Sequence, residues 1–290
     1  MSTHLAEQDA QVGMRALPRS RLLGTIASRP GLALAASYLA VLVLIALFAP
    51  YVSPYDPIEQ NLDLSITGPS AEHWLGTDSL GRDVLSRLMW GARPALIGVA
   101  IAVLTTCGIG IPWGLVSGYA GGFVDQGLMR LADAFLIFPG IVLALVFTTV
   151  LGPSLESTMV ALGIVYSPIL ARVVRSGVMR VATREFVVIT RLYGVSPVYR
   201  MIRHVLPNAL APTLVQVTLL FGMSLLAQTG LSYLGLGVQP PFPSWGGSMA
   251  ESFQYIVIYP LATIIPGTVV IVTVMSIYRI GDALRDSLEN

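Results

Sequence analysis

The chain has 290 residues, of which 54% are hydrophobic and only 11% are charged, and its mean hydropathy is +0.73. These values lie outside the range of soluble domains and predict an integral membrane protein. The 17 basic residues are all arginine and stand against 16 acidic residues, so the near-zero net charge of +1 excludes nucleic acid as a partner class.

The composition gives little indication of a metal or cofactor site. The single Cys107 excludes an internal disulfide, and the three histidines, His4, His73 and His204, are too scattered to indicate a metal site. A phosphate-binding loop of the Gly-x-x-x-x-Gly-Lys-Ser/Thr type needs a lysine, and the chain has none. We therefore expect no catalytic residue, metal or cofactor in this chain.

Six stretches without Asp, Glu, Lys or Arg qualify, or nearly qualify, as membrane spans, because a spanning helix needs about 20 mostly apolar residues. They are 31–55, 94–124, 134–155, 157–171, 205–250 and 252–278. The fourth stretch is short, so we expect its helix to continue through Arg172 and Arg175, whose heads snorkel or face a water-filled cavity. The fifth is too long for one helix, and its Gly/Pro-rich part, 235–247, predicts a loop outside the bilayer or one that re-enters it.

The distribution of arginines predicts the orientation. Fourteen of them fall on one side of the six spans and three on the other, and positively charged loops stay in the cytoplasm. The expected organisation is a cytoplasmic tail at 1–30, a six-span domain at 31–278 and a cytoplasmic tail at 279–290. Within the domain, 54–93 is an external loop and 176–208 a cytoplasmic loop. No cleavable signal peptide is expected.

Two features concern the membrane interior. Gly110, Gly114 and Gly118 form two overlapping small-xxx-small steps, which predict a close helix–helix contact in the second span. Between the predicted interfaces we find no Asp, Glu, Lys or His, which ion-coupled carriers commonly place near the midplane. The sequence therefore offers no coupling-ion site, and energy for transport would come from elsewhere.

Two external segments carry candidate docking residues. Asp83 and Arg87 are spaced as an i,i+4 pair on a short helix at the membrane surface, which is either a structural lid or a substrate contact. In the second segment, prolines stiffen the loop and aromatic rings supply a docking surface for a substrate-delivery protein. The external candidates are Asp78, Arg82, Asp83, Arg87, Pro240, Pro241 and Trp245.

The 184–208 stretch has the rhythm of two short helices at right angles. Phe186, Ile189 and Tyr193 share one face of the first helix, and Gly194 suits a left-handed helix end. Ser196 and Pro197 are typical of the start of the second helix, and Pro207 is expected to end it. The pair is either an interfacial anchor or a docking element for a soluble partner. The candidate coupling residues are Glu185, Phe186, Ile189, Arg191, Tyr193, Gly194, Ser196, Arg203, His204, Pro207 and Asn208.

This stretch resembles the EAA motif of the permease subunits of ATP-binding-cassette (ABC) importers. Gly194, Leu206 and Pro207 fit that pattern, whereas residues 188–190 read Val-Ile-Thr in place of Glu-Ala-Ala, and Glu185 lies three residues earlier. Segments 73–93, 119–133 and 231–246 look like the second permease of dipeptide, oligopeptide and nickel importers, and the resemblance covers roughly 31–286.

The resemblance implies an all-α permease of the type I importer fold with short cytoplasmic coupling helices, in a bacterial inner membrane. It implies a second homologous permease, two ATPase subunits that bind ATP and Mg²⁺, and an external substrate-binding protein as partners. Peptides are the preferred substrate, with nickel, haem and other small solutes left open. The competing classes are a self-sufficient carrier or channel and a structural scaffold.

Overall fold

The computed structural model describes residues 29–289, which are mostly helical. Within this range there is no strand, only one isolated bridge between Thr77 and Asp83, so the predicted all-α fold is confirmed. The five long helices are α3 (Pro30–Val52), α4 (Val84–Ala120), α7 (Leu155–Ala182), α10 (Leu206–Tyr233) and α12 (Leu261–Glu289). The shorter elements are η1 (Leu62–Leu64), α5 (Gly122–Ile137), α6 (Gly140–Leu151), α8 (Glu185–Leu192), α9 (Pro197–Arg200), the π-helical turn η2 (Met201–Val205) and α11 (Trp245–Phe253).

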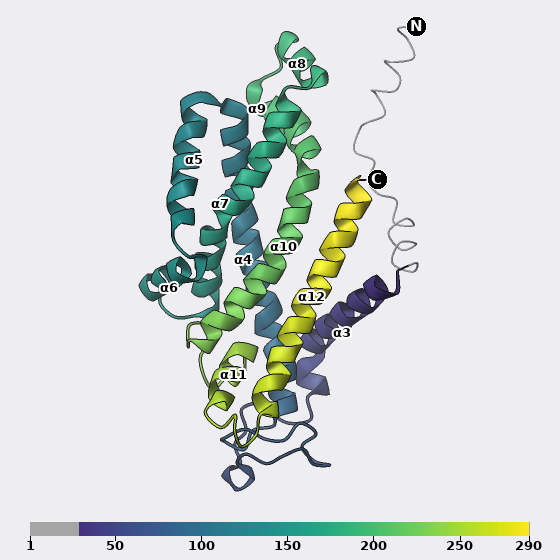
Figure 1. Cartoon of the computed structure of the whole chain (residues 1–290), viewed down its shortest axis with the longest axis vertical. Helices are drawn as coiled ribbons and strands as arrows, with labels where there is room; N and C mark the ends of the chain where they lie inside the picture. Colours follow the sequence, from purple (N-terminus) through teal and green to yellow (C-terminus); the bar gives the residue numbers. More distant parts are fainter. Residues whose placement is uncertain (1–28, 290) are drawn as a thin grey trace.

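The long helices form an elongated bundle with two distinct ends (Figure 1). The first, the α8 end, carries α8 and α9 and the start of α5. At the opposite end, the loop end, the 53–83 loop lies beside α11. Helix α3 lies at the edge of the bundle, next to α12. The long helices therefore connect α8 and α9 at one end with α11 and the 53–83 loop at the other.

Helices α4 and α7 form the centre of the bundle, and glycines determine how closely they pack. A Cβ atom added at Gly114 would lie 2.3 Å from the carbonyl oxygen of Ala171, and one at Gly118 would lie 2.8 Å from that of Arg175. On α7, a Cβ atom added at Gly163 would likewise lie too close to Thr105 of α4. The predicted glycine seam is confirmed, because only residues without a side chain permit this approach.

The remaining long helices pack around this centre. Helix α10 contacts α4, α7 and α12, and Gly222 lies so close to α12 that a Cβ atom there would be 2.4 Å from the Tyr278 ring. Helix α3 is joined to α12 by a 2.9 Å hydrogen bond between the hydroxyls of Tyr38 and Thr273. Most other α3 side chains are exposed, as expected for a helix that faces lipid or another subunit.

Between residues 29 and 289, five helices are long and apolar enough to span a membrane, and a bent pair makes a sixth if its halves count as one span. The third predicted span, 134–155, does not form one straight helix, because α5 and α6 meet at an angle of 93°. The break falls at Phe138, which is extended (φ −87°, ψ 142°), and Pro139. A residue before proline avoids the α conformation, and this local rule outweighs the apolar run.

Two other predicted boundaries were wrong. Helix α4 begins at Val84, inside the predicted external loop, so Arg87 and Arg93 belong to the long helix rather than to a short surface helix. Pro207 does not end the second helix of the 184–208 segment. It lies in the first turn of α10, and the chain is helical from Pro197 to Tyr233.

Candidate functional site

Helix α8 projects from the α8 end of the bundle (Figure 1). One of its faces is apolar and exposed. Val187 is its buried anchor, at 3% exposure, within the main hydrophobic cluster. The predicted face points the other way: Phe186, Ile189 and Tyr193 are 40%, 49% and 83% exposed. Glu185 and Arg191, on the same helix, are also exposed. An exposed row of large apolar side chains on so short a helix is typical of a surface that another protein or the membrane covers.

The turn after α8 fixes the direction of this helix. Gly194 has a φ of 73°, in the left-handed region that favours glycine, as predicted. The amide of Val195 donates to the carbonyl of Thr190 at 3.2 Å, which closes the helix end. Buried Arg200 reaches back and donates to the Val195 carbonyl at 2.6 Å. The turn is therefore held by defined bonds rather than left as a loose loop.

Beyond the turn, the chain leads without interruption into α10. The hydroxyl of Ser196 accepts a hydrogen bond from the amide of Tyr199, as predicted for a helix cap. Pro207 has no N–H to offer the carbonyl of Arg203, and the π-helical turn η2 directly before α10 accommodates this gap. Of the remaining candidates in this segment, Arg203 and Asn208 are exposed, and His204 and Pro207 are partly buried.

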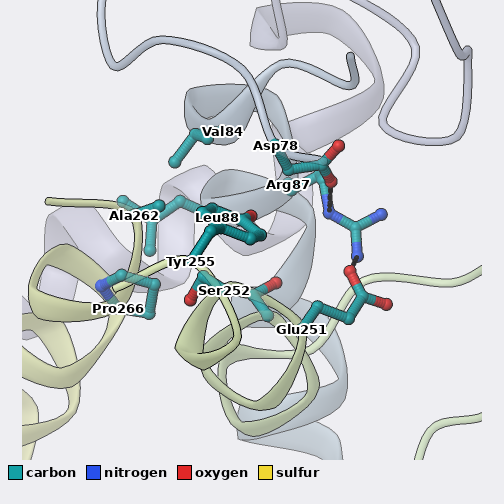
Figure 2. A pocket seen from close by; sticks show the side chains of 10 residues that line it. Asp78, Val84, Arg87, Leu88, Glu251, Ser252, Tyr255, Ala262 and Pro266 are labelled. Carbon is teal, nitrogen blue, oxygen red and sulfur yellow. Dashed lines mark hydrogen bonds and ion pairs between the residues drawn. The ribbon is translucent and has the colours of Figure 1, made fainter. Parts of the chain in front are cut away.

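At the loop end, four charged side chains form a compact cluster, which we call the charged cluster: Asp78, Arg82, Arg87 and Glu251. The Arg82 Nε donates to Asp78 Oδ2 at 2.7 Å, and its Nη2 bonds to Glu251 Oε2. The Arg87 Nη2 donates to Glu251 Oε2 at 3.1 Å, and its Nε lies 3.4 Å from Asp78 Oδ2. Figure 2 shows Arg87 between the two carboxylates.

Most side chains of the charged cluster are buried, and the cluster links separate elements of the fold. Asp78, Arg82 and Arg87 are no more than 5% exposed, whereas the Glu251 side chain keeps 32% of its surface. Two cations and two anions balance each other, and burial of such groups is tolerable only when they are paired in this way. The cluster therefore connects the 53–83 loop, the start of α4 and α11. Burial raises the pKa of the neighbouring Tyr255 hydroxyl, and the Asp78 carboxylate raises it further, so this group adds no charge.

The predicted ion pair between Asp83 and Arg87 was wrong. Asp83 caps α4, where its Oδ2 accepts from the Ser86 amide at 2.7 Å, and its Oδ1 lies 3.0 Å from Nδ1 of His73. A carboxylate at the N-cap position satisfies free helix amides, and this role competes with an i,i+4 pair further along the helix. Asp83 and Arg87 therefore belong to two separate interactions.

The 234–244 loop exposes two of its three prolines, and the tryptophan that follows the loop is buried. Pro240 and Pro241 are exposed, and Phe242 is 65% exposed. Trp245, predicted as a docking residue, is 3% exposed, and its Nε1 donates to the carbonyl of Leu88 at 2.9 Å. It is the first residue of α11 and packs against α4. The prediction that Trp245 is an exposed docking residue was therefore wrong. Residues 245–247 are also helical, although the glycines there predicted a loop.

Sequence reasoning missed Glu251 and Phe242 as site residues. Glu251 is the single charged residue between two long apolar stretches, 205–250 and 252–278. In the prediction of spans it served only as the boundary between them. An acidic residue in that position predicts a buried partner of opposite charge, and this signal could have found it. Phe242 is one of the aromatic rings that predicted a docking surface in this segment, although Trp245 was the only aromatic residue named as a candidate.

Comparisons with known proteins point to one family. Residues 110–289 match the family described as the binding-protein-dependent transport system inner membrane component, and residues 30–69 match the N-terminal transmembrane domain of oligopeptide transport permease C. The dipeptide transport system permease protein DppC of Alkalihalophilus pseudofirmus is 40% identical over 85% of this chain and 81% of its own length.

Two further relatives and one solved structure agree with this match. The di/tripeptide transport system permease protein DppC of Pseudomonas aeruginosa is 40% identical over 87% of this chain and 85% of its own. The glutathione transport system permease protein GsiD of Escherichia coli O157:H7 is 36% identical over 88% and 84%. A structure of the MetNI methionine ABC transporter, inward facing, covers 70% of this chain and 96% of its own, with a TM-score of 0.59 and 18% identity.

Proposed function

The chain belongs to the family of binding-protein-dependent transport system inner membrane components, and on that premise we propose how it works as the permease subunit of an ATP-driven importer. It pairs with a second homologous permease to enclose the translocation path. An external binding protein delivers the solute, and two ATPase subunits, which bind ATP and Mg²⁺, drive the cycle.

The observation that carries this proposal is the exposed apolar face of α8 on a rigid base. Phe186, Ile189 and Tyr193 offer large apolar side chains to a partner, and such anchors dominate protein interfaces. From Pro197 the chain is helical through to Tyr233, so a displacement at the α8 end passes into α10. A coupling element needs both properties: a surface for the ATPase and a stiff connection to the membrane part.

The orientation follows from charge. With the α8 end in the cytoplasm, fourteen arginines stay on the cytoplasmic side, and both chain ends lie there as well. The loop end then faces outward, where exposed Pro240, Pro241 and Phe242 contact the binding protein. The charged cluster lies beneath this surface and holds its elements together.

Peptides are the substrate that we propose, because the relatives bear the names of dipeptide, di/tripeptide and glutathione permeases. Selectivity resides mostly in the binding protein, since this chain has no motif that reads a peptide backbone. Uptake by the reconstituted complex of labelled di- and tripeptides, glutathione, nickel and haem tests this choice. Preferential uptake of nickel or haem would overturn it.

The coupling role is tested in the same complex. Phe186→Ala removes an exposed anchor of α8, and we expect ATP hydrolysis stimulated by the binding protein and solute uptake to fall together, with the two permeases still assembled. Val198→Ala is the control, because Val198 is also an exposed apolar residue, at 61% against 40% for Phe186, but lies on α9. Full coupling in Phe186→Ala, with weaker membrane contact, would leave α8 as an interfacial anchor. Uptake that follows an ion gradient without ATPases would favour a self-sufficient carrier.

A further inference from the structure

A polar cleft of about 480 Å³ lies between α5 and α7 and belongs to neither site described above. Three arginines and two aspartates line it: Arg130, Arg172, Arg175, Asp125 and Asp133. Its residues on α5 run from Asp125 to Asp133, and α5 begins at the α8 end of the bundle (Figure 1). The cleft therefore lies towards the α8 end and not at the centre of the bundle.

Two of the three arginines of the cleft form ion pairs across it, and the third does not. Arg175 donates two hydrogen bonds to Asp125, from Nε to Oδ1 and from Nη2 to Oδ2, each at 2.5 Å. Arg172 donates to Asp133 through its Nη2. Arg130 has no hydrogen bond or ion pair with any part of the chain between residues 29 and 289 and is exposed. The cleft therefore carries one positive charge in excess, and that charge is on Arg130.

Helix α5 also carries exposed apolar side chains. On α5 and at its end, Phe123, Leu131 and Phe138 are 91%, 50% and 57% exposed. These side chains therefore keep half or more of their surface exposed in the described chain. A helix that carries both a free guanidinium group and exposed aromatic and aliphatic side chains fits a molecule with an anionic head and an apolar tail.

We propose that the α5–α7 cleft binds the phosphate group of an anionic membrane lipid. Arg130 is the principal ligand, because its planar guanidinium is free to form paired hydrogen bonds with phosphate oxygens. Half-exposed Arg172 lies on the same cleft and is a second ligand. Basic pockets between membrane helices bind such headgroups, and the leaflet at the α8 end is the anionic one if the orientation proposed above holds.

The test measures lipid retention rather than transport, so its outcome is separable from that of the proposed function. The full chain, purified in its membrane complex, is reconstituted in nanodiscs with equal parts of phosphatidylglycerol and phosphatidylcholine, re-extracted in detergent, and examined by native mass spectrometry. We expect preferential retention of phosphatidylglycerol, and about a fivefold loss of it in Arg130→Gln. Arg180→Gln is the matched control, because Arg180 is also exposed on α7 near the α8 end but does not line the cleft.

A second variant tests the charge balance. Asp133→Asn frees Arg172 from its partner and raises the excess charge of the cleft, so retention of phosphatidylglycerol should increase. Equal retention in Arg130→Gln and Arg180→Gln would overturn the proposal. Displacement by millimolar inorganic phosphate without any preference between lipids would assign the cleft to a soluble anion instead. Loss of the partner permease from the Arg130→Gln complex, with lipid retention unchanged, would assign it to a subunit interface.

Discussion

Gly194 determines the angle at which α8 leaves the bundle, and it does so through backbone conformation alone. Its φ of 73° lies in the left-handed region, and no atom lies within 4 Å of the position that a Cβ would take. Gly194→Val therefore meets no steric obstacle but strains the backbone by roughly 1–3 kcal/mol. We expect α8 to tilt and ATP hydrolysis stimulated by the binding protein to fall with uptake, both measured in the reconstituted complex.

Asparagine provides the control at this position, because it tolerates the left-handed region far better than valine does. Gly194→Asn should keep most of the coupled activity. If valine and asparagine reduce uptake equally, the conformation of residue 194 does not control coupling. If neither has an effect, the direction of α8 is not important for coupling.

Glu251 holds two buried arginines at the loop end. Glu251→Gln leaves Arg82 and Arg87 to share Asp78 alone, which places an excess positive charge among side chains that are at most 5% exposed. We expect the variant complex to lose about 1–3 kcal/mol of unfolding free energy, less than for a fully buried pair, because 32% of the Glu251 side chain is exposed. Thermal unfolding measures the loss. Glu59→Gln, at an exposed position of the 53–83 loop, should change nothing.

Single residues were predictable from sequence where a local rule acts alone. The φ of Gly194, the cap by Ser196 and the exposed face of α8 all follow from neighbours in the sequence. The pairing of Arg87 with Glu251 did not, because Glu251 lies more than 160 residues away and only folding brings it to Arg87. Trp245 was misplaced for the same reason: its partner, the Leu88 carbonyl, belongs to a distant helix.

At the scale of helices, the seam between α4 and α7 makes a specific prediction. A side chain at Gly114 would run into the backbone of α7, where the Ala171 carbonyl oxygen lies 2.3 Å from the Cβ position. Gly114→Leu must push the helices apart, at a cost of about 1–3 kcal/mol or more, because backbone atoms cannot move aside as a side chain can. The yield and thermal stability of the permease pair should both fall.

Gly108→Leu is the matched control on the same helix, since nothing lies within 4 Å of the position of its Cβ. It should leave yield and stability near those of the unchanged chain. Equal loss in both variants would mean that any large side chain in this part of α4 disturbs insertion. Normal yield in Gly114→Leu would show that the glycines do not form a tight seam in the assembled protein.

Helix boundaries were harder to predict than helix existence. Each predicted apolar stretch corresponds to helix in the structure, but prolines act differently by position. Pro139 breaks a span, because Phe138 before it is extended, whereas Pro207 is accepted in the first turn of α10. Pro94 and Pro112 lie inside α4 without ending it. Composition alone does not distinguish these cases, since they depend on which neighbouring groups satisfy the freed carbonyls.

At the scale of the whole molecule, the two ends of the bundle differ in the residues that they carry. The α8 end offers exposed apolar side chains on a stiff helix, and the loop end is fastened by the charged cluster. The fold and the family could be predicted from hydropathy, arginine distribution and the 184–208 motif. The α5–α7 cleft could be predicted only in part. Segment 119–133 and the pair Arg172 and Arg175 were each recognised, but the ion pairs that join them link residues about 40 to 50 positions apart, and no local rule predicts that pairing.

The orientation of these ends is open to direct measurement. Inversion would place fourteen arginines outside and three inside, against the rule that basic loops stay in the cytoplasm. In a Cys107→Ser background, single cysteines at exposed Asp63 and Pro240 on the loop end should react with an impermeant thiol reagent in intact cells.

Cysteines at exposed Gly194 and Asp282 should react only after the membrane is opened, because the α8 end and the end of α12 then face the cytoplasm. Labelling after lysis provides the control that all four positions are accessible in the folded chain. Reaction at Gly194 in intact cells would overturn both the orientation and the assignment of α8 to an ATPase, since ATP is hydrolysed on the cytoplasmic side. Reaction confined to Asp63 and Pro240 places the surface of Pro240, Pro241 and Phe242 where an external binding protein can reach it.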